Sequence, residues 1–261
     1  MTTAGAFDFA GKRVLVTGAS RGIGLGIARG FARAGADLWV LATDERVHAA
    51  AEGLAAETGS TVRGLICDIT DRDRVAETVG GLGALDVLVN NAGLERITPI
   101  DEPGRAVERT FARIIEINVL GTYYVTREAV AHMTAGARIV ITASVWGKSA
   151  EAGFAAYCAS KHANIGFMRA LARELGPRGI TVNAVCPGWV RTDASMRSLA
   201  RIAAREERDQ DATLADITAT QAIDGLMEPD DVAGAYLFLA SAQAANVTGQ
   251  ALNVDRGELM A

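Results

Sequence analysis

The amino-acid sequence predicts an α/β fold in which one domain carries a doubly wound parallel sheet with helices on both faces. Short apolar runs alternate with stretches of helical periodicity along the whole chain, and this alternation is typical of βαβ units. The runs are apolar on both faces, as strands are when helices cover each side of a parallel sheet. The 261 residues contain no linker and no repeat of solenoid period, so we expect a single domain over residues 1–261.

The first strand, turn and helix carry the clearest local pattern. An apolar run at 14–16 stops at a turn that reads Gly18-x-x-x-Gly22-x-Gly24, and apolar residues then recur at helical spacing over 23–34. Glycine permits positive φ and lets a phosphate approach without a Cβ in the way. Free amides at the start of a helix, with the helix dipole, attract an anion. We interpret this turn as a dinucleotide pyrophosphate site; an ordinary glycine-rich turn is the alternative, because the spacing is not the common Gly-x-Gly-x-x-Gly.

The remaining elements continue the alternation in order, after a loose lead-in at 1–10. Strands are expected at 37–41, 61–66, 87–89, 138–143, 181–186 and 251–254, which makes about seven strands with the first. Helices are expected at 46–58, 71–79, about 107–133, 154–175 and 230–240. Thr70 or Asp71 can cap the helix that starts there, and Gly176 with Pro177 ends the helix at 154–175.

Residues 191–226 break the alternation and carry many charges. A surface excursion of no consequence is one interpretation. We favour a lid over the site, because long irregular segments in compact domains are usually functional. The segment also follows the sixth strand, near the carboxyl edge where such sheets bind ligands.

Composition excludes several classes of function. The net charge is −5 and lysine is scarce, so no nucleic-acid or membrane surface is expected. Cys67, Cys158 and Cys186 are odd in number and widely spaced, which indicates neither a disulfide framework nor a zinc site, and no bound metal is expected. No signal peptide and no apolar run of transmembrane length is found, so we predict a cytoplasmic protein.

Four polar residues form the candidate catalytic set. Tyr157 and Lys161 are one helical turn apart, where an ammonium would lower the pKa of the phenol and let it exchange a proton near neutral pH. Alone, such a pair is more often on the surface. Ser144 ends an apolar strand and could hydrogen-bond the same substrate oxygen. Asn118 lies in an apolar helix, where it either ties two elements together or holds a water in a proton relay.

These residues, the turn at 18–24 and Asn90-Asn91-Ala92-Gly93 resemble the classical short-chain dehydrogenase/reductase family in order and spacing, from Lys12 to about Val254. The resemblance implies a Rossmann-type sheet. It implies that Tyr157 is the acid/base, that Lys161 lowers its pKa and binds the nicotinamide ribose, that Ser144 positions the substrate oxygen and that Asn118 holds the relay water.

The resemblance also implies a nicotinamide cofactor site. Asp68 would contact the adenine, the Pro187-Gly188 turn would lie beside the nicotinamide, and Thr192 would contact its carboxamide. The expected cofactor-binding residues are Gly18, Ser20, Arg21, Gly22, Ile23, Gly24, Thr43, Asp44, Asp68, Ile69, Asn91, Ala92, Gly93, Tyr157, Lys161, Pro187, Gly188, Val190 and Thr192. One departure is Arg256, which replaces a glycine of the family's terminal Val-Asp-Gly-Gly and puts that turn's geometry in question.

The choice between the two cofactors depends on the end of the second strand. NAD-preferring relatives carry an Asp there that bonds the ribose 2′-hydroxyl and repels a 2′-phosphate. By strand register that position is Ala42, while Arg21 offers a guanidinium and Thr43 a hydroxyl, as in the family's β-ketoacyl-carrier-protein reductases. NADP(H) is therefore favoured. NAD(H) is the alternative if Asp44 reaches the ribose.

The function predicted from these residues is an NAD(P)-dependent oxidoreductase that interconverts a secondary alcohol and a ketone of a small-molecule substrate. The candidate substrate-pocket residues are Glu95, Trp146, Phe154 and Trp189, although the aromatics could be core packing and Glu95 a solvated loop residue. A dehydratase- or epimerase-type relative and a nucleotide-binding scaffold are the alternatives.

The resemblance further implies a homotetramer that pairs the helices at about 107–133 and 154–175. Ala163, Ile165, Phe167 and Ala170 are the candidate interface residues, unless they face the sheet.

Overall fold

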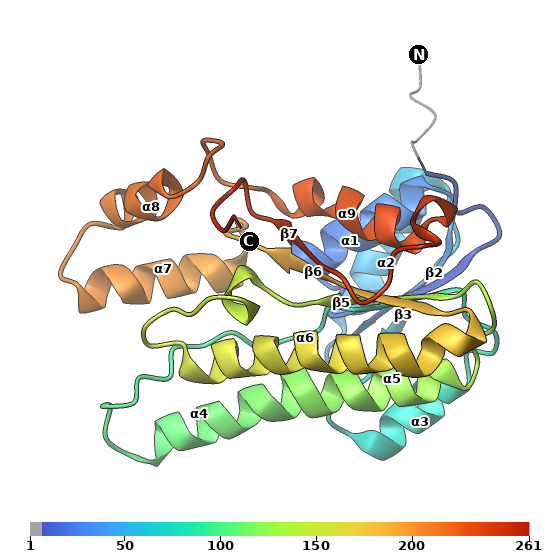
Figure 1. Ribbon diagram of the computed structural model, residues 1–261, viewed down its shortest axis with the longest axis horizontal. Coiled ribbons are helices and arrows are strands. Elements are labelled where there is room, and N and C mark those ends of the chain that lie inside the picture. Colours follow the sequence, from blue (N-terminus) through green and yellow to red (C-terminus); the bar gives the residue numbers. More distant parts are fainter. Residues whose placement is uncertain (1–6, 261) are drawn as a thin grey trace.

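The computed structural model describes residues 7–260, which form a seven-stranded sheet with the strand order β3-β2-β1-β4-β5-β6-β7 (Figure 1). The strands are β1 Arg13–Thr17, β2 Asp37–Ala42, β3 Val62–Ile66, β4 Val87–Asn90, β5 Arg138–Thr142, β6 Thr181–Pro187 and β7 Ala251–Val254. Every neighbouring pair is parallel. The order reverses between β1 and β4, which is where a doubly wound sheet opens a crevice at its carboxyl edge. The predicted fold class is confirmed.

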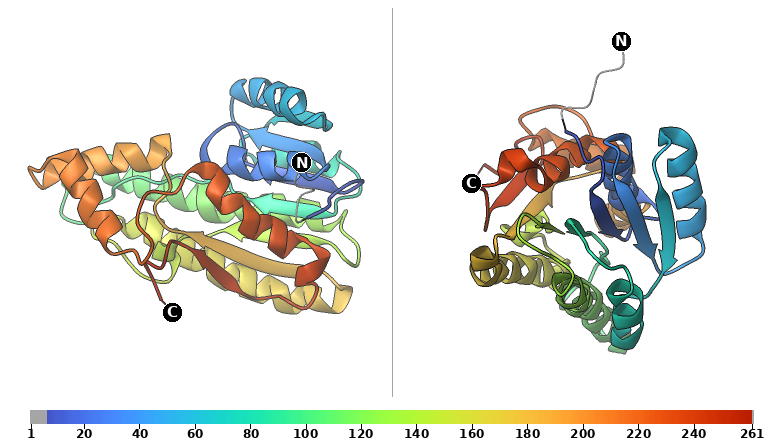
Figure 2. Two further views of the ribbon diagram at one scale, coloured as in Figure 1. Left: turned by 90° about the horizontal axis from the view of Figure 1, so that it is seen from above. Right: turned by 90° about the vertical axis from the view of Figure 1, so that its right-hand side faces the viewer.

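Helices cover both faces of the sheet, as Figure 1 and the right-hand view of Figure 2 show. One core lies under α1 Gly22–Arg33, α2 Arg46–Thr58 and α9 Ala233–Ala240, and the other under α3 Arg72–Gly80, α5 Thr122–Val130 and α6 Ala155–Leu175. Successive residues of β1 point to opposite faces, so that Val14 and Val16 enter the first core and Leu15 the second. This two-sided burial explains why the strands read as apolar throughout.

The expected helix at about 107–133 is three segments in a row. The α-helix α4 Arg105–Ile115 passes into a π-helical segment, Glu116–Gly121, and then into α5. The π-helical segment contains Asn118, and such segments often mark functional sites. Helical periodicity in the sequence does not distinguish a π turn from an α turn.

The segment 191–226 is not irregular, which corrects the sequence-based expectation. It contains α7 Asp193–Arg205 and α8 Gln210–Ala219, and Figure 2 shows both helices projecting beyond one end of the sheet. A capping box begins α7, because Thr192 Oγ1 accepts from the Ser195 amide at 3.1 Å and Ser195 Oγ accepts from the Thr192 amide at 3.0 Å. Only a narrow face of α7 is buried, and the rest of the helix carries many charges. Few buried apolar residues are therefore available to predict this helix from the sequence.

The C-terminal turn keeps a glycine-like backbone although an arginine stands in it. Arg256 has a φ of 55°, in the left-handed region that few non-glycine residues adopt. Its carbonyl accepts from the amides of Ala222 and Ile223, and its guanidinium donates to the carbonyl of Asp224 at 2.6 Å. The arginine therefore ties the C-terminus to the end of the 191–226 segment.

Among residues 7–260, no helix has both the length and the apolar character that crossing a bilayer requires.

Candidate active site

The turn after β1 needs its glycines for two different reasons. Gly18 has a φ of 67°, and a Cβ on it would lie 2.6 Å from Ala92 Cα. A Cβ on Gly24 would lie 2.2 Å from the Gly18 carbonyl oxygen. Asn91 holds the turn against β4, since its Nδ2 donates to the carbonyls of Thr17 and Gly18 at 3.0 and 3.2 Å. The amides at the start of α1 are thus presented to an open edge, as a pyrophosphate site requires.

A cavity of about 530 Å³ lies at this carboxyl edge and brings together most of the predicted residues. Its lining includes Ser144, Tyr157 and Lys161, with Glu95, Trp146 and Trp189 of the expected substrate pocket. The expected cofactor residues that line it are Gly18, Ser20, Arg21, Gly22, Ile23, Gly24, Thr43, Asp44, Asp68, Ile69, Asn91, Ala92, Gly93, Gly188, Val190 and Thr192. Three predicted residues, Asn118, Phe154 and Pro187, are outside the lining.

Lys161 is held at the base of this cavity, where it is 3% exposed. Its Nζ donates to the main-chain carbonyl of Thr142 at 2.7 Å and lies over the ring of Tyr157, 5.4 Å from the centroid. Sequence reasoning missed Thr142, which precedes Ser144 by two residues at the end of β5. Ser144 begins the next turn, and its Oγ accepts from the Trp146 amide at 3.2 Å.

Burial raises the pKa of the Tyr157 phenol, and the Glu95 carboxylate raises it further, while a hydrogen bond with Ser144 lowers it. The lowering of this pKa by Lys161 stays a prediction. The same burial lowers the pKa of Lys161 to about 8, so its positive charge is itself disfavoured. The ammonium of Lys161 lies over the face of the phenol ring and donates to the carbonyl of Thr142. These two contacts hold it beside the edge of the ring, where it could also contact a bound ligand.

Asn118 is completely buried, and its amide ties elements together, which is one of the two roles considered from sequence. Its Oδ1 accepts from the Leu94 amide at 2.7 Å, and its Nδ2 donates to the Leu94 carbonyl and to Ser160 Oγ at 3.0 and 2.9 Å. A Cβ on Gly93 would lie 3.3 Å from Asn118 Oδ1 and 3.7 Å from Lys161 Nζ, so Gly93 separates the two side chains. The proton-relay role remains a proposal.

Two further residues are placed differently from the expectation. Phe154 is 1% exposed and packs against Trp146, with ring centroids 4.8 Å apart. It therefore lies behind Trp146 and does not line the cavity. Trp146 in turn lies 6.0 Å from the rings of both Tyr157 and Trp189. Pro187 is buried at the end of β6, and its neighbour Gly188 lines the cavity instead.

Residues of α7 complete the cavity, and sequence reasoning missed them because the helix itself was not expected. Ser198 donates to Glu95 Oε1 at 2.5 Å, and Arg197 lines the cavity nearby. Burial raises the pKa of the Glu95 carboxyl, although Ser198 and the neighbouring Arg96, Arg197 and Arg201 oppose this shift. Glu95 is therefore a half-buried carboxyl close enough to Tyr157 to raise the pKa of its phenol.

The end of the second strand lines one part of the cavity, together with Arg21. Strand β2 stops at Ala42, and Thr43 and Asp44 then line the cavity beside Arg21. Arg46 binds both oxygens of Asp44, with Nε 3.0 Å from Oδ1 and a terminal nitrogen 2.5 Å from Oδ2. This contact holds the pKa of the Asp44 carboxyl below its usual range. The negative charge at this position is thus already paired.

Comparison with known proteins agrees with this geometry. The family model described as enoyl-(acyl carrier protein) reductase matches residues 18–258. The chain belongs to the short-chain dehydrogenase/reductase family. This is a family of NAD(P)-dependent oxidoreductases, and the members similar to the chain include 3-oxoacyl-(acyl-carrier-protein) reductases and L-sorbose reductase.

Two relatives from the family illustrate its range. A cyclic-di-GMP-binding biofilm dispersal mediator protein of Escherichia coli is 40% identical over 95% of this chain and 97% of its own length. A 3-oxoacyl-(acyl-carrier-protein) reductase of Vibrio harveyi is 36% identical over 96% of this chain and 98% of its own.

Two solved structures of the family contain the phosphorylated cofactor. A short chain dehydrogenase from Burkholderia cenocepacia in complex with NADP has a TM-score of 0.83 and 34% identity, covering 96% of this chain and 98% of its own. L-Sorbose reductase from Gluconobacter frateurii, complexed with NADPH and L-sorbose, has a TM-score of 0.87 and 29% identity, covering 98% and 99%.

Proposed function

We propose that the protein interconverts a secondary alcohol and a ketone of a small molecule, with NADP(H) as the hydride carrier. The observation that carries the proposal is that Tyr157, Ser144 and Lys161 line one cavity with the glycine-bearing turn at 18–24. Three groups that can place and move a proton therefore stand beside a site suited to a dinucleotide.

The residues present fit the cofactor. The close packing at Gly18 and Gly24 leaves the start of α1 open to a pyrophosphate, and Lys161 is positioned to donate to ribose hydroxyls. When bound, the nicotinamide supplies or accepts the hydride. Tyr157 then gives a proton to the carbonyl oxygen or takes one from the alcohol, and the Ser144 hydroxyl holds that oxygen. The indole rings of Trp146 and Trp189 line the cavity and keep bulk water from the reacting carbon.

A preference for NADP(H) is supported at the far end of the cavity. Strand β2 ends at Ala42, which carries no charge, and Asp44 is paired with Arg46 rather than free to repel a phosphate. Arg21 and Thr43 line the same end and can donate to the 2′-phosphate. The phosphorylated cofactor in solved relatives supports the same choice.

A homotetramer is part of the proposal, because two neighbouring helices expose apolar surface. Phe111 of α4 and Tyr123 of α5 are 41% and 42% exposed, and Ala163 and Ala170 of α6 are exposed beside them. Ile165 was also a candidate for the interface, but it is 4% exposed and faces the sheet, so it is not part of the proposed interface. Light scattering at micromolar protein is expected to give the tetramer mass, and monomer mass alone would reject the assembly.

The segment 191–226 is proposed as the lid, since α7 contributes Arg197 and Ser198 to the cavity. A cytoplasmic location is also proposed. Its support is that Cys67, Cys158 and Cys186 are buried free thiols, which a reducing compartment preserves.

The decisive experiment compares two tyrosine variants. Oxidation of NADPH is followed by absorbance with a panel of ketones for the wild type, Tyr157→Phe and Tyr124→Phe. Tyr124 lies on α5, and its hydroxyl is outside the cavity lining, so its variant is the matched control. Turnover is expected to fall by about 10² to 10⁴ only in Tyr157→Phe, with NADPH binding retained. Near-normal turnover in that variant would reject the assignment.

Nucleotide binding without turnover is the second candidate, because a relative with 40% identity is named as a cyclic-di-GMP-binding protein. The observation that favours it is an arginine-lined hollow beside the catalytic cavity. Calorimetry with cyclic di-GMP tests it. The complete Tyr157, Ser144 and Lys161 set favours the oxidoreductase, because a binding protein needs no proton donor.

A further inference from the structure

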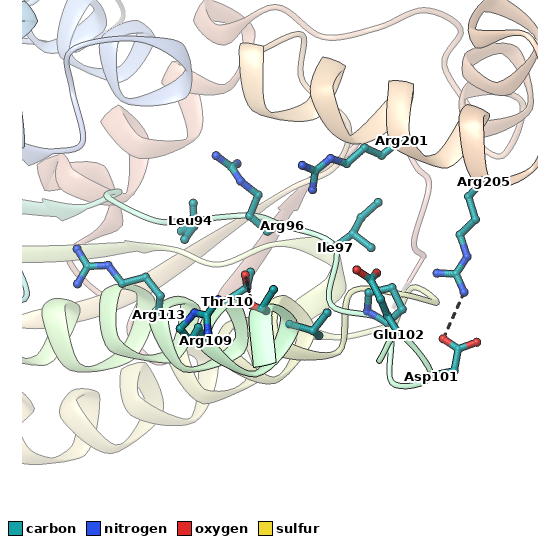
Figure 3. Close-up of a pocket in the computed structure, with 13 residues that line it drawn as sticks. Leu94, Arg96, Ile97, Asp101, Glu102, Arg109, Thr110, Arg113, Arg201 and Arg205 are labelled. Carbon is teal, nitrogen blue, oxygen red and sulfur yellow. Dashed lines mark hydrogen bonds and ion pairs between the residues drawn. The ribbon is translucent and has the colours of Figure 1, made fainter. Parts of the chain in front are cut away.

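The hollow beside the catalytic cavity has a volume of about 960 Å³ and lies between the loop at 94–102, α4 and α7. Its lining contains five arginines, Arg96, Arg109, Arg113, Arg201 and Arg205, against two carboxylates, Asp101 and Glu102. We call it the arginine hollow. Figure 3 shows Arg96 extending from the loop and Arg201 from α7 into the space between them, with Arg109 and Arg113 on α4.

The arginine hollow adjoins the catalytic cavity. Leu94, Arg96 and Arg113 line both, so the end of a molecule bound at Tyr157 would come close to Arg96 at the boundary with the hollow. Arg197, one turn before Arg201 on α7, lines the catalytic cavity at the same boundary. The arginines therefore stand at the mouth of the substrate site.

Two of these arginines are already neutralised. Arg113 contacts Asp68 at 2.9 Å and Glu116 at 2.7 Å, and Arg205 lies 3.6 Å from Asp101. The positive charges of Arg113 and Arg205 are therefore paired with carboxylates of the protein.

The other arginines have no such partner. Within residues 7–260, no carboxylate lies within ion-pair distance of Arg96, Arg109, Arg197 or Arg201. Burial lowers the pKa of Arg96, and the nearby Arg197 and Arg201 lower it further, while Glu95 raises it. Several like charges at one boundary are costly unless an anion joins them.

On the proposed oxidoreductase function, we infer that the substrate is an anionic alcohol or ketone whose carboxylate or phosphate binds Arg96, Arg197 and Arg201. A planar guanidinium suits both groups, since it donates two parallel hydrogen bonds to either. The hydroxyl or carbonyl to be converted then lies at Tyr157 and Ser144, and the anionic end lies at the boundary with the arginine hollow.

The test uses two matched pairs of ketones. One pair is 4-oxopentanoate and its methyl ester, and the other is 5-hydroxypentan-2-one and its phosphate ester. Each pair differs mainly in the charge of one end, so the pairs separate a carboxylate from a phosphate preference. Rates are measured with NADPH for the wild type, for the double variant Arg197→Gln/Arg201→Gln and for Arg72→Gln. Arg72 is an exposed arginine at the start of α3, outside both cavities, and its variant is the control.

The wild type is expected to favour at least one anionic ketone over its neutral partner by tenfold or more in kcat/KM, chiefly through KM. The double variant should lose this preference, with a fall in kcat/KM at least fivefold larger on the anionic ketones than on the neutral ones, and Arg72→Gln should keep it. The preference should also shrink at high salt, because ions screen charges as exposed as those of Arg197 and Arg201. Equal efficiencies within both pairs, or equal losses on neutral and anionic ketones in the double variant, would overturn the inference.

Calorimetry separates failure of this inference from failure of the proposed function. Binding of 4-oxopentanoate and of the phosphate ester to the protein with NADP⁺ needs no turnover. If no ketone is converted but an anion binds and the double variant loses that binding, the anion site stands and the oxidoreductase proposal falls. Cyclic di-GMP that binds through the same arginines, in a protein with no preference for anionic ketones, would assign the hollow to an effector and overturn the inference.

Discussion

The ammonium nitrogen of Lys161 lies over the ring of Tyr157, 5.4 Å from its centroid, and is anchored by the main-chain carbonyl of Thr142 at 2.7 Å. The lysine is therefore placed by the end of β5 and not by the phenol. This placement suits the proposed roles of Lys161, in which one side chain contacts both Tyr157 and the ribose of a bound cofactor. It also keeps a charge in a buried position, where its pKa is lowered to about 8.

Replacement of Lys161 by methionine is expected to damage chemistry and cofactor binding together. The rate should fall by about 10² or more, and the KM for NADPH should rise. Because the charged form of Lys161 exists below its pKa of about 8, kcat/KM of the wild type should fall as the pH rises through that value. Rates measured from pH 6 to 10 check this, and a step near pH 8 that persists in Lys161→Met would contradict the role.

Cofactor choice is expected to depend on Arg21 and on the pairing of Asp44 with Arg46. Arg21→Ala should weaken the binding of NADPH by about 1.5–3 kcal/mol, because it removes a hydrogen bond between charged groups. The binding of NADH should stay unchanged. Arg46→Ala should also weaken NADPH, since it leaves the Asp44 carboxylate free to repel the phosphate. Catalytic efficiencies with both cofactors decide the matter. A wild type that strongly prefers NADH, and loses this preference in Asp44→Ala, would show that Asp44 holds the ribose.

The lid is expected to be the first site of proteolysis. Residues 206–209 between α7 and α8 are exposed, and Glu207 has a φ of 53°. Limited digestion with proteinase K should cut within 191–226 first, and more slowly once NADPH and a ketone are present, because closure orders the segment. Mass spectrometry of the early fragments provides the measurement. Cleavage at the same rate with and without ligands would argue against a lid.

Stability is expected to depend on pH through Glu258, which lies beside Gly188 and Asp255. Burial raises the pKa of the Glu258 carboxyl to about 7, and its Oε2 has no hydrogen-bond partner. The folded protein therefore binds a proton that the unfolded chain releases between its ordinary pKa of 4.5 and 7. Stability from this group is full below pH 4.5 and is lost as the pH rises through 7.

Glu258→Gln should accordingly raise the free energy of unfolding at pH 8 by on the order of 1 kcal/mol, after allowance for partial exposure. At pH 5 the difference should be smaller. Thermal melts of the wild type and the variant at the two pH values provide the measurement. An equal effect of the substitution at both pH values would show that the carboxyl is ionised throughout.

Much of the site could be predicted because its signals are local. The glycines at 18–24 and the pair Tyr157 and Lys161 lie within single turns, and the strand at 138–143 carries Ser144 to the same edge of the sheet. The parallel sheet then brings these pieces together, since the carboxyl ends of its strands meet at one edge. The strand expected at 37–41 is β2, which runs one residue further, to Ala42.

The sequence by itself thus determined the α/β class and most of the strand and helix alternation, and it predicted the residues that are proposed here for catalysis. Only the tertiary structure decided that Phe154 lies behind Trp146, that the Asn118 amide is occupied by Leu94 and Ser160, and that α7 exists and places Arg197 and Arg201 beside Arg96. Apart from the pair Phe154 and Trp146, these contacts join residues tens of positions apart. Their geometry depends on how separate helices pack, and a local pattern records the spacing within one element but not the direction in which its neighbour lies.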